Sequence, residues 1–232
     1  MNTHTTISIR RAAWLLWGGI LACAPALAAA PAVWINEFHY DNTGADTGEF
    51  IEVAGVAGTS LSSYMLWLYN GVGGVTYDSI SLSGTLPNEG NGFGSLSFAA
   101  PSLQNGSPDG FALYDGSMVL QFLSYEGTFT AAAGVANGMT SQDVGVDEDP
   151  APEAGMSLQL TGVGDSYGDF TWSGPATASL GSLNAGQSVT VPEPRSGFLL
   201  LSAVCLGAVW RRWRRQAKAT VEPPSRAATR PD

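Results

Sequence analysis

The chain has 232 residues, of which 44% are hydrophobic, and it carries 20 Asp and Glu against 10 Lys and Arg. All ten Lys and Arg lie outside residues 31–190, whereas seventeen acidic residues lie inside, so this interval has a net charge near −17. These numbers exclude nucleic-acid binding, which needs cations to replace phosphate counterions, and arginine clamps on phosphate or carboxylate. Both cysteines, Cys23 and Cys205, also lie outside the interval, which excludes disulfides, cysteine nucleophiles and zinc–thiolate sites within it.

Residues 1–28 are predicted to be a signal peptide that directs export across the inner membrane. Arg10-Arg11 precede a short apolar run, and Ala26-Leu27-Ala28 fits the small-x-small pattern of signal cleavage. Two alternatives stay open. Adjacent arginines also occur in twin-arginine signals, and Ile20-Leu21-Ala22-Cys23 resembles a lipobox in which Cys23 would be acylated.

Residues 31–185 are predicted to form a single all-β domain. Short apolar or alternating runs occur at 33–40, 49–54, 64–69, 75–82, 93–98, 111–114, 118–124, 157–161 and 169–172. Asp115-Gly116 separates two of these runs and indicates a tight hairpin, because glycine tolerates the positive φ that such a turn requires. Many short strands with frequent turns favour a β-sandwich. Residues 131–152 are expected to form a long surface loop.

A cluster of carboxylates near the first two expected strands suggests a cation site. Asp41, Asp46 and Glu49 lie on a glycine-containing segment that supplies several side-chain oxygens. Calcium takes six to eight oxygen ligands, so these three residues are our candidate calcium ligands. The competing interpretation is an ordinary polar turn, since Asp, Asn and Gly are also the usual turn residues. A second acidic cluster lies between residues 143 and 153.

Catalytic interpretations of the same region are weaker. A nucleophilic triad would need His39 as its base, but no Gly-x-Ser-x-Gly elbow is present, and we expect His39 to be a surface or rim residue. Glu37 paired with Glu49 or Glu52 is a candidate for glycoside cleavage. Three tryptophans within expected strands are predicted to pack in the core: Trp34, Trp67 and Trp172. Three tyrosines are candidates for a sugar-stacking surface: Tyr40, Tyr69 and Tyr125.

The C-terminal region has three parts in a fixed order. A Pro-Glu-Pro motif within linker 186–195 precedes an apolar run and a basic cluster, which together span 196–215, and a tail at 216–232 is predicted to be disordered. The residues of the motif and the cluster are Val191, Pro192, Glu193, Pro194, Arg211, Arg212, Arg214 and Arg215. The apolar run is shorter than the roughly 20 residues of a comfortable membrane span, and the arginines would stay cytoplasmic.

This arrangement resembles the PEP-CTERM sorting signal of Gram-negative bacteria. The resemblance implies an exosortase as partner, a transient membrane anchor and delivery to the cell surface or the outside. The family usually ends at the basic cluster, whereas residues 216–232 follow it here.

A second resemblance covers residues from about 34 to 185. The blocks INEFHYDNTGADTGEFIEV, LSSYMLWLYNG, NGSPDGFALYDG, QFLSYEGTFT, SLQLTG and DFTW are similar, in order and spacing, to bacterial lamin-tail domains. This resemblance implies an immunoglobulin-like β-sandwich. In bacteria such domains are attached to secreted nucleases, phosphatases and other surface enzymes and are not known for catalysis themselves.

The sequence therefore predicts an exported, non-catalytic surface or extracellular-matrix protein that acts in adhesion or binds exopolysaccharide or other surface proteins. The alternative is a secreted hydrolase, or an accessory module of a secreted nuclease or phosphatase, that uses the carboxylates near residues 37–52. A purely structural coat component is the third expectation.

Overall fold

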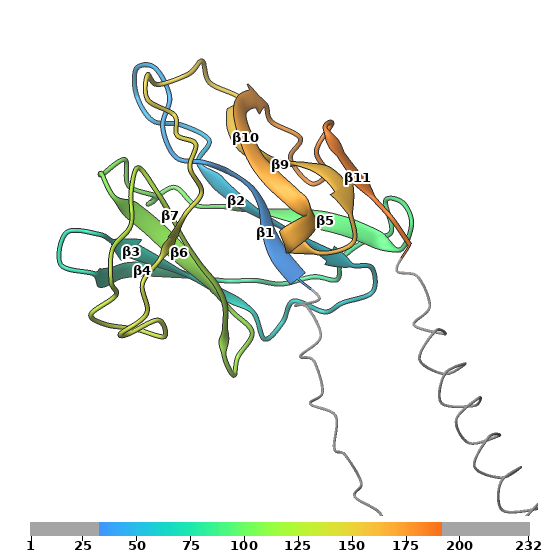
Figure 1. Ribbon diagram of the computed structural model, residues 1–232, viewed down its shortest axis with the longest axis horizontal. Coiled ribbons are helices and arrows are strands. Elements are labelled where there is room, and N and C mark those ends of the chain that lie inside the picture. Colours follow the sequence, from blue (N-terminus) through green and yellow to red (C-terminus); the bar gives the residue numbers. More distant parts are fainter. Residues whose placement is uncertain (1–32, 192–232) are drawn as a thin grey trace, which may run out of the picture.

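The computed structural model describes residues 33–191, which form two β-sheets with almost no helix (Figure 1). The first sheet has the order β10-β9-β1-β2-β5, with β11 beside β9, and the second has the order β4-β3-β6-β7-β8. The strands of the first sheet are β1 (Val33–His39), β2 (Phe50–Val56), β5 (Phe93–Ala99), β9 (Met156–Gly164), β10 (Phe170–Thr177) and β11 (Gln187–Val189). Those of the second are β3 (Met65–Asn70), β4 (Val75–Ser81), β6 (Asp109–Tyr114), β7 (Val119–Tyr125) and β8 (Gln142–Asp143). A 3-10 turn, η1 (Tyr167–Asp169), joins β9 to β10.

All nine expected runs form strands, and the expectation of an all-β, two-sheet domain is confirmed. Two strands were not predicted, β8 and β11, and each pairs in parallel with a longer neighbour. They have two and three residues, too few to show an alternation of apolar and polar side chains. β8 lies within the expected surface loop, and β11 lies within the segment 186–195 that we expected to be a linker.

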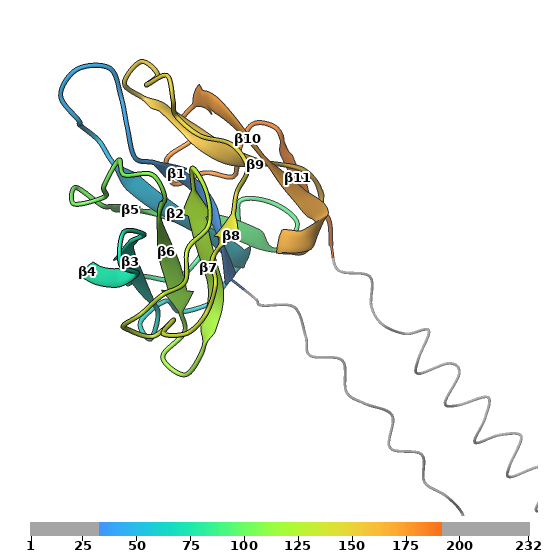
Figure 2. The ribbon, with the colours of Figure 1, turned by 60° about the vertical axis from the view of Figure 1, so that its left-hand side comes forward.

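Aromatic side chains of both sheets meet in the core. The ring of Phe38 lies 4.9 Å from that of Phe111 and 5.2 Å from that of Trp172, both edge-on. Trp34 lies 5.9 Å from Phe93. Such edge-on and tilted aromatic contacts add to the stabilisation from burial. Figure 2 shows the two layers that these rings join, with β1 and β2 behind β6 and β7.

The tyrosine prediction was wrong. Tyr40, Tyr69 and Tyr125 are each 0% exposed, so their rings do not form a surface for sugar stacking. The ring of Tyr40 stacks on that of Tyr125 at 4.0 Å, within the main core. Trp34 and Trp172 are buried in that core as expected, whereas Trp67 is only partly buried and packs against a smaller cluster around Tyr69.

A β-bulge shapes the first strand. The pairing of β1 with β2 shifts register between Ile35 and Glu37, which leaves Asn36 as the extra residue. A bulge redirects the side chains that follow it. Here it places Glu37 directly opposite Glu52, and all seven residues of β1 are buried.

The predicted export and sorting segments fall almost entirely outside the described residues. These are the signal peptide at 1–28, the apolar and basic segment at 196–215, the tail at 216–232, and the sorting motif apart from Val191, which is exposed. Residues 33–191 contain no helix with the length and apolar character needed to cross a membrane.

Candidate functional site

His39 is buried in an ion pair rather than exposed at a rim. Its side chain is 2% exposed, and Nδ1 lies 2.9 Å from Oε1 of Glu148. The other oxygen of Glu148 accepts the backbone N–H groups of Tyr40 and Asp41, each at 2.8 Å. Burial by itself lowers the pKa of His39, but the hydrogen bond to Glu148 and its charge outweigh burial, so the pKa is raised. The expectation of a surface histidine was wrong because the segment that leads to β9 folds back over the end of β1.

This contact leaves His39 poorly suited to act as a general base. Nδ1 is held by Glu148, and Nε2 lies 3.4 Å from the side-chain oxygen of Asn42. A base in a nucleophilic triad needs a nitrogen within reach of a nucleophile and of the substrate. The His39–Glu148 pair instead joins β1 to the loop before β9.

Glu37 lies in a buried polar layer beneath the chain that crosses from β10 to β11. Its carboxylate accepts the hydroxyl of Ser157 at 2.5 Å and the amide of Gln159 at 3.2 Å. It also accepts the backbone N–H and the hydroxyl of Ser179 at 2.9 and 2.6 Å. These four donors satisfy the carboxylate without any basic side chain, which allows it to be fully buried.

Glu52 completes the polar layer beside Glu37. Its carboxyl group accepts the side-chain amide of Asn36 at 3.2 Å and the backbone N–H of Gly181 at 2.6 Å. Burial and, after it, the negative charge of Glu37 raise the pKa of Glu52 to about 8. Glu52 is therefore largely protonated at neutral pH. Both carboxyl groups are 0% exposed, so the pair expected for glycoside cleavage is close together but covered by the crossing segment.

The three candidate calcium ligands are not gathered into one site. The amide of Asn105 donates to Asp41 at 3.1 Å and to Asp46 at 2.9 Å, which ties these two together. Burial and then the charge of Asp46 raise the pKa of Asp41. Glu49 directly precedes β2 and lines a separate shallow hollow with Phe50 and Leu180. Within residues 33–191, no group of three or more His, Cys, Asp or Glu side chains is placed to hold a metal ion.

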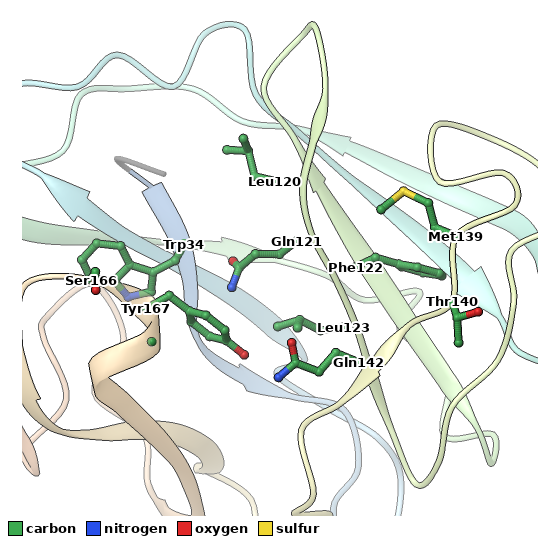
Figure 3. A pocket seen from close by; sticks show the side chains of 11 residues that line it. Trp34, Leu120, Gln121, Phe122, Leu123, Met139, Thr140, Gln142, Ser166 and Tyr167 are labelled. Carbon is green, nitrogen blue, oxygen red and sulfur yellow. The ribbon is translucent and has the colours of Figure 1, made fainter. Parts of the chain in front are cut away.

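An uncharged cleft of about 530 Å³ opens between the two sheets (Figure 3). Trp34 of β1 and Leu120 to Leu123 of β7 line it on one side. The other lining residues are Met139, Thr140, Gln142, Ser166, Tyr167 and Gly168, the last two from η1. Its volume falls in the range of about 300–1,000 Å³ that is typical of ligand sites. The lining combines apolar and aromatic groups with amides and hydroxyls, and carries no acidic or basic side chain.

Gln121 supplies an unpaired hydrogen-bond donor in this cleft. The residue is 8% exposed, and its side-chain oxygen accepts the backbone N–H of Ile35 at 2.6 Å. Because an N–H can only donate, the amide orientation is fixed and the NH₂ group must point away from Ile35. That nitrogen is buried and has no partner among the described residues. An unsatisfied buried donor costs about 1–3 kcal/mol.

Sequence reasoning did not identify Gln121 or Glu148 as important. Gln121 occurs within a run that predicts a strand, and nothing local shows that its amide reaches β1. Glu148 is one of several acids in a polar loop, and its contact with His39 joins residues 109 positions apart. The one available signal was the absence of Lys and Arg from the domain, which leaves a carboxylate as the natural partner for the single histidine.

Comparison of the chain with protein-family models, curated proteins and solved structures gives no match.

Proposed function

We propose that the chain is an exported, non-catalytic surface or extracellular-matrix protein whose β-sandwich binds exopolysaccharide. The observation that carries this proposal is the uncharged cleft, because it lies in a domain with seventeen acids and no Lys or Arg. Amides and hydroxyls among apolar walls are the groups expected of a site for a neutral, hydroxyl-rich ligand.

The state of the titratable groups favours binding over hydrolysis. Glu37 and Glu52 are buried with their oxygens occupied, and both nitrogens of His39 face fixed partners. General acid–base catalysis needs such groups within hydrogen-bond distance of the substrate. This arrangement supports a binding module over a hydrolase that uses these three residues.

The C-terminal motif supports export and sorting. In the proposal, an exosortase-type enzyme processes the chain at the segment from Val191 to Arg215, after transient anchoring in the inner membrane. The two-sheet fold agrees with a lamin-tail-like, immunoglobulin-like domain, which is the finer fold type that we propose. The large negative charge would keep such a domain soluble outside the cell.

A glycan array probed with the purified domain, residues 31–191, tests the binding function. We expect retention on neutral polysaccharides, including the exopolysaccharide of the host strain. Failure to retain any polysaccharide would contradict the proposal. The intact mass of the exported protein tests the sorting independently: loss of both terminal segments is expected, and a full-length C-terminus would contradict processing.

A further inference from the structure

We propose that the cleft between β7, β1 and η1 is a subsite for a neutral carbohydrate, in which the Gln121 amide donates a hydrogen bond to a ligand oxygen. This inference rests on the proposed binding function and identifies its site. The orientation of the amide is fixed, because its oxygen accepts from the backbone N–H of Ile35, and its NH₂ group has no partner among the described residues. In Figure 3 this NH₂ group points into the space between Trp34, Leu123 and Tyr167.

The charge of the domain selects against anionic ligands. The cleft lining has no basic side chain that could pair with a carboxylate or phosphate, and the whole domain has a charge near −17. The acidic side chains of the domain would repel an anion that comes within roughly a Debye length, and no basic side chain in the cleft would offset this repulsion. The lining also has no carboxylate that could pair with a cation. We therefore expect a ligand that is neutral where it enters the cleft and that carries an oxygen acceptor for Gln121.

Other polar groups of the lining fit a ligand that both donates and accepts. Gln142, Thr140 and Ser166 contribute amide and hydroxyl groups. The hydroxyl of Tyr167 accepts the indole N–H of Trp172 at 3.1 Å, which leaves its own proton free for donation. Sugar hydroxyls act as donor and acceptor at once, and their C–H faces pack against rings such as the partly exposed Tyr167.

An extended peptide fits this place less well. Peptides that dock on β-sandwiches commonly add a strand to a free sheet edge, where main-chain hydrogen bonds provide the affinity. The edge of β7 next to the cleft is already occupied by β8 at Leu123 and Ser124. The backbone N–H of Val144 also donates to Ser124. The observations therefore favour the carbohydrate.

Gly168 allows the cleft to be blocked with little effect on the fold. It lines the cleft within η1. A Cβ added to it would meet no atom within 4 Å, and its φ is outside the left-handed region that disfavours other residues. Gly90, outside the cleft, has the same two properties and provides the matched control. Gly168→Trp should therefore fill the opening, whereas Gly90→Trp adds the same side chain elsewhere.

The experiment measures binding of neutral hexasaccharides by calorimetry: a β-glucan, a mannan and an N-acetylglucosamine oligomer, with oligogalacturonate as the anionic comparison. We expect at least one neutral probe to bind the wild-type domain, oligogalacturonate to bind none, and Gly168→Trp to weaken binding by at least tenfold while Gly90→Trp leaves it unchanged. Gln121→Glu keeps the oxygen that accepts from Ile35, and it removes the donor when the new carboxyl group is ionised. Compared with the wild-type domain at pH 9, it should weaken binding by a similar factor. Circular dichroism checks that each variant is folded; if Gln121→Glu does not fold, Gly168→Trp still decides.

The failures are distinguishable. Neutral binding that survives Gly168→Trp overturns the assignment of this cleft but leaves the proposed function standing. The absence of binding to any neutral probe overturns both. Two further results overturn the neutral-carbohydrate assignment. One is that oligogalacturonate binds more strongly than the neutral hexasaccharides. The other is that an uncharged hexapeptide binds more strongly than they do and that Gly168→Trp abolishes this binding.

Discussion

At the scale of single residues, neutral donors take over the role that Lys and Arg have in other domains as partners of buried acids. Within residues 33–191, the pair between His39 and Glu148 is the one salt bridge. Other buried carboxyl groups are satisfied by hydroxyls, amides and backbone N–H groups, as at Glu37 and Glu52. The stability of the domain should therefore depend on pH through a few identifiable groups.

Glu148→Gln should destabilise the domain by about 3 kcal/mol at pH 6, since removing one partner of a buried ion pair leaves the other charge uncompensated. The raised pKa of His39 means that this pair stabilises the fold below the unfolded pKa of roughly 6.5 and loses its effect as the pH rises through the folded pKa. The cost of the substitution should accordingly be smaller at pH 9. Urea unfolding at both pH values measures this cost. Asp147 is exposed, so Asp147→Asn is the control, and its free energy of unfolding should stay within about 0.5 kcal/mol of wild type. An equal cost at both pH values would contradict the charged pair.

Glu52 should make the domain less stable as the pH rises from about 5 to 8. Its folded pKa is raised to about 8 from 4.5, so in this range the folded state binds more protons than the unfolded state, and the free energy of unfolding falls with pH. Glu52→Gln should reduce the slope of melting temperature against pH, leaving the part due to His39. The exposed Glu153→Gln is the control and should keep the wild-type slope. An unchanged slope in Glu52→Gln would show that Glu52 ionises normally.

At the scale of elements, the sequence was informative where side chains alternate and uninformative where contacts are distant. The nine longer strands follow from runs such as residues 75–82 and from turns such as Asp115-Gly116. The bulge at Asn36 could not be predicted, because it is visible only in the pairing with β2. For the candidate site, the nearness of Glu37 to Glu52 was predictable, but their burial depends on the segment around Ser179 and Gly181, more than 120 residues away.

β11 gives an element-scale prediction about the domain boundary. It pairs with β9, and the side chain of Gln187 donates to Asn36 at 2.8 Å while Val189 is buried. A domain cut at residue 185 loses one buried side chain and its hydrogen bonds, so its free energy of unfolding should be about 2 kcal/mol lower than that of a domain ending at 191. In urea unfolding, this loss appears as a lower midpoint. Equal midpoints would mean that residues 186–191 are a linker, as the sequence predicts.

At the scale of the whole molecule, the charge near −17 is the dominant feature. The described part of the chain has one internal ion pair, which offsets little of this charge. The acidic side chains of the folded state therefore repel one another, and salt would screen this repulsion. We expect the melting temperature to rise as sodium chloride increases from about 0.01 to 0.5 M, where the Debye length shortens from roughly 30 to under 10 Å. A melting temperature that is independent of salt would show that the acids are too well separated to interact.

Calcium tests the remaining sequence prediction at the same scale. If Asp41, Asp46 and Glu49 bind the ion, millimolar calcium should raise the melting temperature above that in sodium chloride of equal ionic strength, and a chelator should reverse the effect. Since the structure does not gather the three residues, we expect calcium to act only through ionic strength. A specific, chelator-reversible increase would contradict this expectation.

The central claim is that the domain binds polysaccharide without cleaving it. The direct test is to incubate the purified domain, residues 31–191, with the exopolysaccharide of the host strain, and to measure both the fraction that co-sediments and the chain length of the polymer by size-exclusion chromatography. We predict that the domain co-sediments and that the chain length stays unchanged. Shortened chains, or a domain that remains in the supernatant, would contradict the account.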